Sequence, residues 1–571
     1  MKDLTFRSYI LILCLVGAVI YFHSLTNQFL LDDPSQISNN PAVHSLTNIP
    51  QLFLGSTFAG GKNLEGIYYK PVMTTFYTVI YSLFGANPFP FHLIQLILHA
   101  LNAILVFLLL KKFFSSNLSF LLSLIFLVHP MNSENVLYIS NLQDALFMFF
   151  GLLSLNQITK DKLKLKDYLL FTLFICLSLL SKETGLLFLI VGSAYRIIFQ
   201  RGKSFLYISG GILVSYLLIH YLAVGAPVST DTPFPIMRLS LLERLLNVPA
   251  IVFYYLKTFA FPADLAVGQQ WVVRNLTFEN FYLPLILNSA FFLGLLGLLT
   301  RLKGEKFKKF LFFLIWLVIG LGLHLQIMPL DATVADRWIY FPMIGLLGMV
   351  SILLLVILNL IQDPYRFRIK SGMTIMVIII IVIFSVRSFN RASDWKDGLT
   401  LASHDTKVTT DSFVMENNLG FELINAERYP EAQLAIEKST SLAPYWWLNW
   451  NNLGVVYRHE GKMDQAEEAF RKSTENTDTF FMPYENLAEL LLYFKDPKEA
   501  ETFIVQASNK LGMSEKLWFI LSITEFKLEN MDNALKAAQQ ALALNPNNQT
   551  YQQLVQALQT NQKIIVEPPK Y

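Results

Sequence analysis

The stretch "SYILILCLVGAVIYFHSLTNQFLLDDPSQ", residues 8–36, joins a long apolar run directly to a pair of acidic residues. An α-helix rises about 1.5 Å per residue, so about 20 apolar residues are enough to cross a bilayer. The run follows Lys2 and Arg7 and lacks the small-x-small pattern of a signal-peptide cleavage site. It therefore predicts an uncleaved first transmembrane helix, after which the chain reaches Asp32 and Asp33.

The composition agrees with a membrane protein. The 571 residues are 53% hydrophobic and 14% aromatic, with a mean hydropathy of +0.43, which is too apolar for an ordinary soluble protein. A net charge of +3 indicates no nucleic-acid partner. The two cysteines, Cys14 and Cys176, both lie in apolar runs and suggest neither a disulfide framework nor a metal site. No HExxH, CxxC, P-loop or nucleophile-elbow pattern occurs. Zinc-dependent hydrolysis, nucleotide-driven transport and serine hydrolysis therefore lack support from the sequence.

Apolar runs of this kind recur along the first 390 residues. We predict about eleven transmembrane helices, at residues 8–25, 91–110, 116–130, 141–158, 167–181, 184–199, 204–224, 282–300, 309–328, 338–360 and 371–390. The segment 245–262 contains Pro249 and Lys257, and we interpret it as interfacial because a further crossing would break the charge pattern of the loops.

The basic loops set the orientation of these helices. With the amino terminus in the cytoplasm, five basic loops in succession are cytoplasmic, as the positive-inside rule requires: Lys111–Lys112, 160–166, Arg201 with Lys203, 301–309 and 366–370. The loops that carry most of the conspicuous polar motifs then share the opposite side of the membrane. An odd number of spans also places everything after residue 390 on that side.

The carboxyl-terminal part has a 34-residue period. Three columns keep this spacing: Leu419, Leu453, Leu487 and Leu521; Gly420, Gly454, Ala488 and Ser522; and Ala432, Ala466, Ala500 and Ala534. Pro444 and Pro546 lie in the turns that end the first and last units. This is the tetratricopeptide pattern, in which each unit is a pair of antiparallel helices with small residues at their crossing. We therefore expect about four such repeats in residues 412–562.

The acidic pair has two interpretations. Asp33 precedes Pro34, and aspartate followed by proline is a favoured start for a helix, so Asp33 could be an N-cap. Asp32 has no such structural duty. It could act as a general base toward a hydroxyl group, or the two carboxylates together could hold a divalent cation.

Two further polar turns lie on the same predicted side. "VHPMNSEN" carries His129 and Glu134, and "LSKETGL" carries Lys182 and Glu183. A polar interhelical turn explains the first pair and an internal ion pair explains the second. Ionisable residues near membrane depth are also functional candidates, because each needs a partner when it is buried. Both interpretations stay open for both turns.

A third motif, "ADRWIYFP", follows the ninth predicted span and carries Asp336 and Arg337. Aromatic residues such as Trp338 are expected at a membrane interface without any ligand. A guanidinium at this surface is suited to bidentate contact with a phosphate, and Lys70 in "YYKPV" could supply a second cation.

The order of these motifs resembles a known family. "FLLDDPSQISNNPAV", "YYKPVMTTFY", "FHLIQLILHALNA", "VHPMNSENV", "LSKETGL" and "ADRWIYFPMIGL", followed by tetratricopeptide repeats, are similar to the transmembrane and tetratricopeptide-repeat-containing O-mannosyltransferases and their bacterial relatives. The likeness covers nearly the whole chain. It implies an all-α protein of the GT-C glycosyltransferase superfamily, in which a multi-span helical core precedes an α-solenoid.

The resemblance also implies roles for individual residues. Asp32 and Asp33 match the family's acidic motif, one of them activating the acceptor, while Glu134, the pair Lys182 and Glu183, and Arg337 match its other charged positions. Two positions depart from the expected pattern. Lys70 stands where an arginine is expected, which keeps the charge but loses the planar fork, and Leu142 occupies a position that is often basic.

From this resemblance we expect a membrane glycosyltransferase that moves a hexose, most simply mannose, from a polyprenyl-phosphate donor to hydroxyl groups of proteins outside the cytoplasm. Asp32 would be the base, Asp33 would orient it or share a metal, and Arg337, Lys182 and Lys70 would bind the phosphate. The supporting polar residues would be His129, Glu134, Glu183 and Asp336. No cofactor is firmly implied, and the need for a divalent cation is left open.

The expected organisation is a glycosyltransferase domain at 1–390, a linker at 391–411, repeats that contact a protein acceptor at 412–562 and a tail at 563–571. We expect a bacterial inner membrane with the repeats in the periplasm, or the endoplasmic reticulum in a eukaryote. Two alternatives stay open: a glycosyltransferase for an envelope polysaccharide or lipid, and a non-catalytic membrane scaffold.

Overall fold

The structure, a computed structural model, describes residues 5–57, 68–200, 205–225, 234–360 and 365–560. The predicted tail at 563–571 lies outside these residues. The chain forms two compact units, residues 1–409 and 410–571. The described residues are overwhelmingly helical, and their one isolated β-bridge pairs Gln269 with Val334. The all-α prediction is therefore confirmed.

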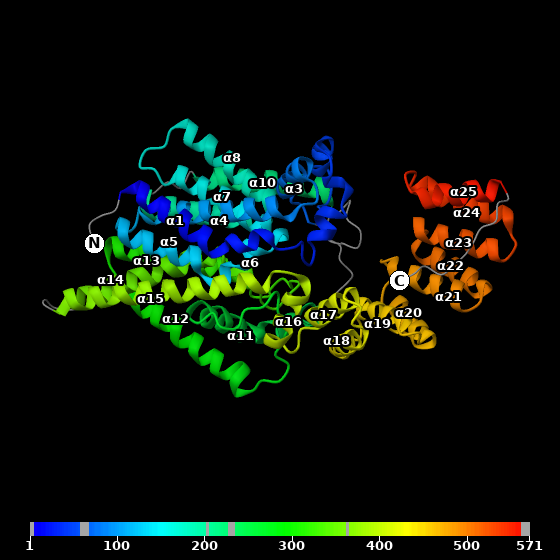
Figure 1. Ribbon diagram of the computed structural model, residues 1–571. Coiled ribbons are helices and arrows are strands. Elements are labelled where there is room, and N and C mark those ends of the chain that lie inside the picture. The colour runs from blue at the N-terminus through cyan, green and yellow to red at the C-terminus, as the bar shows by residue number, and fades with distance from the viewer. Residues whose placement is uncertain (1–4, 58–67, 201–204, 226–233, 361–364, 561–571) are drawn as a thin grey trace. The chain divides into compact units, whose positions relative to one another are not determined.

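The first unit is a bundle of helices (Figure 1). Its α-helices are α1 (Phe6–Tyr21), α2 (Ile49–Leu52), α3 (Pro71–Phe84), α4 (Pro88–Leu110), α5 (Ser116–Val128), α6 (Glu134–Leu137), α7 (Leu142–Ile158), α8 (Leu165–Ser181), α9 (Leu186–Gln200), α10 (Phe205–Val224), α11 (Leu241–Ala260), α12 (Leu283–Arg301), α13 (Gly304–Gly322), α14 (Pro342–Leu360), α15 (Tyr365–Asp394) and α16 (Gly398–Val408). A helix occupies each of the eleven segments predicted to span the membrane.

Fewer helices than eleven are long and apolar enough to cross a membrane on their own. In the described residues five meet this requirement, within Phe6–Thr26, Pro88–Leu110, Phe205–Val224, Phe278–Arg301 and Gly372–Asp394, and a sixth is added if the pair Ser116–Val128 and Pro130–Leu137, bent by 53°, is one span. Several others are short: α5 has 13 residues and α9 has 15. At about 1.5 Å per residue such helices do not cover a hydrocarbon core of about 30 Å unaided.

Helix α4 lies at the centre of the unit, where it packs against α1, α5 and α7. In its most apolar window 61% of the residues are buried inside the protein, compared with 11% in the window of α12. Helix α12 therefore presents most of its apolar surface outward, which suits contact with lipid. The buried centre of α4 carries polar side chains, including His99 and Asn102, and both contact the Tyr340 hydroxyl.

The segment 391–411, expected to be a linker, is largely helical. Helix α15 continues to Asp394, and α16 follows after a short turn. Arg391 and Asp405 are buried and form an ion pair with Nη1 and Oδ1 2.8 Å apart, while Asp405 also accepts a hydrogen bond from the amide of Val267. These contacts attach α16 to the first unit.

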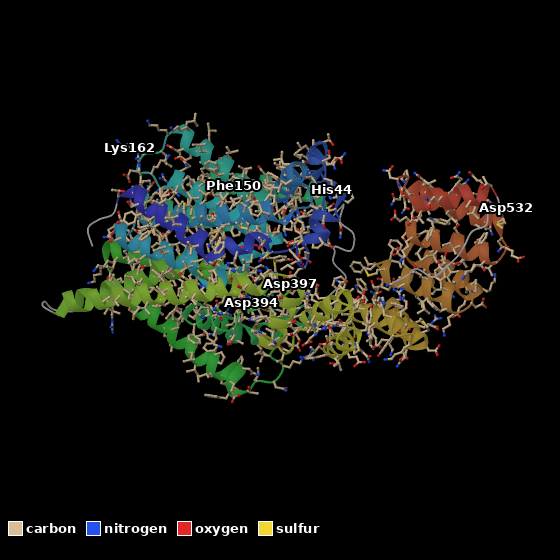
Figure 2. The ribbon with its side chains drawn as sticks, in the orientation of Figure 1. His44, Phe150, Lys162, Asp394, Asp397 and Asp532 are labelled. Atoms are coloured by element: carbon tan, nitrogen blue, oxygen red, sulfur yellow. The ribbon has the colours of Figure 1, made fainter. Side chains whose placement is uncertain are left out.

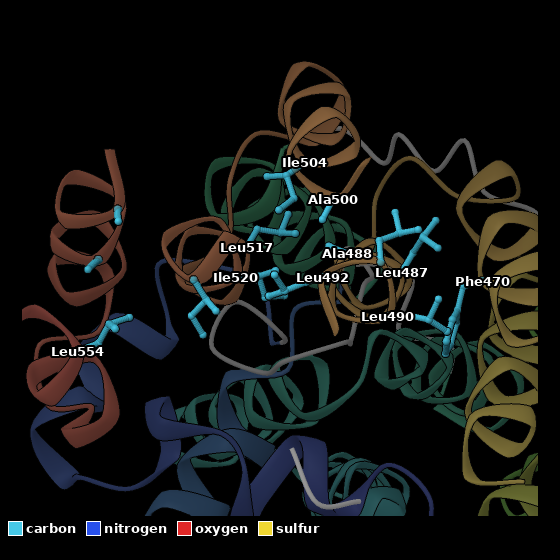
Figure 3. Close-up of a cluster of buried hydrophobic side chains, with 14 of the residues drawn as sticks. Phe470, Leu487, Ala488, Leu490, Leu492, Ala500, Ile504, Leu517, Ile520 and Leu554 are labelled. Carbon is cyan, nitrogen blue, oxygen red and sulfur yellow. The ribbon is translucent and has the colours of Figure 1, made fainter. Parts of the chain in front are cut away.

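Within the described residues, up to 560, the second unit contains four helix pairs followed by one more helix. Its helices are α17 (Phe413–Asn425), α18 (Tyr429–Leu442), α19 (Trp447–His459), α20 (Met463–Glu475), α21 (Met482–Phe494), α22 (Pro497–Leu511), α23 (Glu515–Lys527), α24 (Met531–Leu544) and α25 (Gln549–Gln559). Figure 3 shows part of its apolar core, which includes Phe470, Leu487 and Ile520. At Gly454 an added Cβ would lie 2.6 Å from the Phe470 ring, which explains the small residue at this position. The solenoid predicted from the 34-residue period is therefore present.

Candidate functional site

The two aspartates have different environments. Asp33 is buried, and its carboxylate accepts hydrogen bonds from the amide of Leu30 at 2.9 Å and from both the amide and the hydroxyl of Ser140 at 2.8 and 2.5 Å. A helical turn does begin at Pro34, but the Asp33 side chain does not cap it, so the capping interpretation is wrong. The carboxylate instead ties the loop of residues 27–33 to the start of α7. Burial raises the pKa of Asp33 to about 7 against these hydrogen bonds.

Asp32 keeps a solvent-accessible side chain. The surrounding protein nevertheless displaces enough water to raise its pKa, while the Tyr138 hydroxyl and the charge of Arg337 act in the opposite direction. The preceding residue, Leu31, has a φ of +54°, a conformation that residues with a side chain rarely adopt. Such strain is found mostly where the surrounding structure imposes it, often at functional sites. The accessible carboxylate is thus suited to proton transfer.

Arg337 is held by Glu134. The guanidinium Nη1 lies 2.6 Å from the Glu134 carboxylate, and the Arg337 amide donates to the other oxygen at 3.0 Å. The turns that carry these residues, η5 (Pro130–Asn132) with α6 and η10 (Asp336–Ile339), pack against each other. Nη2 lies 3.9 Å from Asp331, beyond hydrogen-bond distance. Glu134 therefore orients the guanidinium through Nη1. Nη2 makes no hydrogen bond to Asp331.

Lys182 pairs with an acid that the sequence analysis did not single out. Its Nζ lies 2.8 and 3.0 Å from the two carboxylate oxygens of Asp144 in α7. Of the two interpretations left open for this turn, the one that paired Lys182 with Glu183 therefore names the wrong partner. Glu183 is half-buried. Burial alone would raise its pKa, but the charges of Lys70 and Lys182 outweigh that effect and the net pKa is lowered. Glu183 thus stays ionised near both lysines.

Lys70 is buried beside these groups, and its Nζ lies 4.1 Å from the centre of the Tyr68 ring. Burial lowers the pKa of Lys70, and the charge of Glu183 opposes this effect. The charges of Lys70, Arg337 and Asp331 all act on the carboxylate of Asp32. The fold therefore brings together charged residues that are far apart in the sequence.

A small pocket lies beside these cations. Its lining includes Asp144, Lys182, Thr184, His324 and Arg337. Thr184 Oγ1 and His324 Nδ1 are buried and have no hydrogen-bond partner among the described residues. Polar atoms without partners are rare in buried positions, and a ligand or water commonly satisfies them. Two cations with these two polar atoms form a setting suited to an anion.

Two predicted supporting residues have structural contacts. His129 is buried, its Nε2 lies 3.0 Å from the carbonyl oxygen of Phe259, and its Nδ1 accepts the amide of Met131. Asp336 accepts a hydrogen bond from the Tyr254 hydroxyl at 2.6 Å. Burial, with the nearby charge of Glu134, raises the pKa of Asp336 to about 8. Both residues hold α11 against the turns of the site.

Leu142, the other departure from the family pattern, is buried at the start of α7.

A cation shared by Asp32 and Asp33 would have to displace hydrogen bonds that Asp33 already accepts. Both oxygens of Asp33 already accept hydrogen bonds, so a cation would compete with Leu30 and Ser140. Within the described ranges, no group of three or more His, Cys, Asp or Glu side chains is arranged to hold a metal ion.

Sequence reasoning missed Asp144 and Tyr138. Asp144 is an acid inside the apolar run of α7, and an ionisable residue at such a position could have been singled out as needing a partner. For Tyr138 the sequence offered no comparable reason to single it out. Its contact with Asp32 depends on the fold of a turn 106 residues further along the chain.

Two family models match parts of the chain. The family model described as dolichyl-phosphate-mannose-protein mannosyltransferase matches residues 70–228, and a tetratricopeptide repeat model matches 449–478 and 515–548. These matches support a membrane glycosyltransferase that carries tetratricopeptide repeats.

The chain is also similar to individual proteins that are named protein O-mannosyl-transferases. The protein O-mannosyl-transferase TMTC3 of Homo sapiens is 22% identical over 96% of this chain and 69% of its own length. The protein O-mannosyl-transferase F38B6.6 of Caenorhabditis elegans is 22% identical over 72% of this chain and 59% of its own length. TMTC1 of Mus musculus is 31% identical over 24% of this chain and 16% of its own length. The chain thus spans about two thirds of the length of the first of these relatives. The resemblance to the transmembrane and tetratricopeptide-repeat-containing O-mannosyltransferases is confirmed.

Proposed function

We propose that the protein transfers a hexose, most simply mannose, from a polyprenyl-phosphate donor to hydroxyl groups of protein acceptors on the extracytoplasmic side of the membrane. The observation that carries the proposal is the grouping of an accessible carboxylate, Asp32, with the cations Arg337 and Lys70 on loops that the basic-residue pattern assigns to one side. The names of the relatives support protein O-mannosylation at the level of the family.

In this mechanism Asp32 takes the proton from the acceptor hydroxyl as its oxygen attacks the anomeric carbon of the sugar. The bond between that carbon and the phosphate oxygen breaks, and the polyprenyl monophosphate leaves with the electron pair. Arg337 and Lys182, which line the pocket, stabilise the charge that develops on the phosphate, and Lys70 adds a third cation. A single displacement inverts the anomeric configuration, whereas an enzyme-linked intermediate retains it.

We also propose the topology that this function requires. The helices in all eleven predicted segments enter or cross the membrane, the shorter ones within the bundle, with the amino terminus in the cytoplasm. The repeat unit then lies outside the cytoplasm, in the bacterial periplasm or the endoplasmic reticulum, where it contacts protein acceptors.

Cysteine labelling tests this topology. Lys162 lies in a predicted cytoplasmic loop and Asp532 lies in the repeat unit (Figure 2). Lys162→Cys and Asp532→Cys would each be made in a chain in which serine replaces Cys14 and Cys176. The two new thiols should react with a membrane-impermeant reagent from opposite sides of the membrane. Reaction of both from the same side would contradict the topology.

The test of the function is sugar transfer by the purified full chain, with a mannosyl polyprenyl phosphate donor and a serine- and threonine-containing peptide. Asp32→Asn keeps the shape of the side chain and removes the base, and we expect about a 10²-fold to 10⁴-fold loss of kcat. Asp264→Asn is the control, because Asp264 is 70% exposed and pairs only loosely with Lys257 at 3.5 Å. Full activity of Asp32→Asn would exclude the role of base.

The phosphate site has its own test. Arg337→Lys keeps the charge and removes the planar fork, so we expect a donor KM about tenfold higher. Glu134→Gln should have a smaller effect in the same direction, because Glu134 orients the guanidinium. A donor KM that is unchanged in Arg337→Lys would argue against phosphate binding by Arg337.

A further inference from the structure

The corner between α15 and α16, residues 391–405, packs against the loop that carries Asp32. Figure 2 labels Asp394 and Asp397 at this corner. The amide of Gln28 donates to the carbonyl oxygen of Lys396 at 3.2 Å, and Ser393 Oγ lies 3.3 Å from His23 Nε2. His23 and Gln28, which both precede Asp32 in the chain, therefore contact the corner.

The corner also reaches Asp32 through two aromatic rings. Trp395 is fully buried, and its ring packs on that of Tyr138 with centroids 5.7 Å apart and planes inclined by 36°. The Tyr138 hydroxyl accepts the amide of Asp32 at 3.4 Å. Gln95 of α4 donates to the carbonyl oxygen of Tyr138 at 2.6 Å. Tyr138 thus contacts both α4 and the corner, and its hydroxyl contacts Asp32.

An ion pair fixes Trp395 in turn. The Arg391 guanidinium makes two contacts with the Asp405 carboxylate, at 2.8 and 3.2 Å, and its Cζ lies 5.8 Å from the centre of the Trp395 ring. Both charged side chains are at most 3% exposed. Desolvation offsets much of the attraction in such a buried pair, but its directional contacts restrict the geometry of what packs against it.

We propose that Tyr138 and Trp395 are positioning residues that hold the Asp32 carboxylate in the orientation required for proton transfer, with the Arg391–Asp405 pair clamping Trp395. This inference rests on the proposed role of Asp32. The need for such support follows from Leu31, because its left-handed backbone at φ +54° is unfavourable for leucine and persists only where neighbouring contacts enforce it.

The kinetic test uses Tyr138→Phe and Trp395→Leu. Misplacement of a catalytic group by about 1 Å can lower the rate by about 10²-fold, so we expect kcat to fall about tenfold or more while the KM values of donor and acceptor change less than about twofold. A loss of donor or acceptor binding instead, with kcat unchanged, would contradict positioning.

A pH profile separates positioning from general stability. The groups that act on Asp32 are Tyr138, Arg337 and Lys70, which lower its pKa, and Asp331, which raises it; Asp33 is adjacent in the chain. Removing the Tyr138 hydroxyl raises the pKa of Asp32. The base must be ionised, so the acid limb of the profile should move to higher pH in Tyr138→Phe. An unmoved limb would contradict the contact.

Hydrogen exchange provides a measurement that does not require activity. Trp395→Leu should accelerate exchange of the amides in residues 27–33 about tenfold, because the loop loses its support. Trp316→Leu is the matched control, since Trp316 is also fully buried but donates to the carbonyl oxygen of Phe341. Equal exchange in the two variants would overturn the inference. Accelerated exchange with no sugar transfer by the unmodified protein would instead support the attachment and contradict the proposed function.

Discussion

Two charge pairs, one from each unit, differ in how they form. In the first unit, Arg337 and Glu134 are 203 residues apart, and their side chains are 14% and 5% exposed. In the repeat unit, Arg428 and Glu431 are three residues apart in one helical turn and are 47% and 56% exposed. The first kind of pair requires the whole fold, and the second requires a single helix.

This difference has energetic consequences. Removing one partner of a buried pair leaves an uncompensated charge and costs about 3–5 kcal/mol, whereas an exposed pair is worth about 0–1 kcal/mol. Charges that are kept in costly surroundings need a reason other than stability. For Arg337 and Glu134 the proposed function supplies such a reason, because both lie at the candidate site.

The largest expected effect follows from breaking a buried pair. Asp144→Ala leaves Lys182 buried without its partner, and we expect the free energy of unfolding to fall by about 3–5 kcal/mol. The measurement is the urea dependence of unfolding of the detergent-purified full chain.

The control for this prediction replaces both partners. Asp144→Leu with Lys182→Met removes both charges, so most of the stability should return although sugar transfer should not. If Asp144→Ala is as stable as the unmodified protein, the contrast between buried and exposed pairs is wrong.

The second prediction concerns packing at the helix crossings of the repeat unit. In Gly454→Val, the added Cβ would lie 2.6 Å from the Phe470 ring, so we expect a loss of about 1–3 kcal/mol from overpacking. Hydrogen exchange of α19 and α20 measures the local effect. The control is Gln465→Val, which adds the same side chain at an exposed position of α20. Equal exchange in the two variants would contradict tight packing at Gly454.

The same contrast explains which parts of the fold the sequence could predict. The repeat columns, such as Gly420 and Gly454, record contacts between the two helices of one repeat, so their 34-residue spacing was sufficient to predict the solenoid. The membrane segments were located by their hydropathy. Their number was harder to determine, because apolar runs predicted as spans, such as those of α5 and α9, form helices of only 13 and 15 residues.

For the candidate site, the sequence indicated which charged residues to consider but not their partners. The positive-inside rule predicts that the loops of Asp32 and Arg337 share one side of the membrane, and in the structure the charge of Arg337 acts on Asp32. Sequence reasoning could not predict that Lys182 pairs with Asp144 rather than its neighbour, because the backbone direction after α8 decides this. The contact between Tyr138 and Asp32 likewise depends on tertiary packing.

A third prediction concerns pH. The pKa of Asp336 is raised to about 8 in the folded protein, against 3.8 for an ordinary aspartate. Between these values the folded state binds more protons than the unfolded state, so stability falls as pH rises from about 4 to about 8, by at most about 1.4 kcal/mol per pH unit. Asp336→Asn should flatten the dependence of Tm on pH between about 5 and about 8. The control Asp264→Asn, at an exposed site, should leave the slope unchanged.

The smallest effect is expected where the charge pair is exposed and local. Arg428→Ala removes the contacts of the guanidinium with Glu431 at 2.8 and 2.5 Å, yet we expect a loss of only about 0–1 kcal/mol, because water solvates both groups almost as well. The loss should shrink further at about 1 M salt, which screens exposed charges. The free energies of unfolding of Arg428→Ala and Asp144→Ala, measured under the same conditions, compare the exposed pair with the buried pair directly. A loss above about 2 kcal/mol that persists in salt would mean that the repeat unit also depends on its charge pairs.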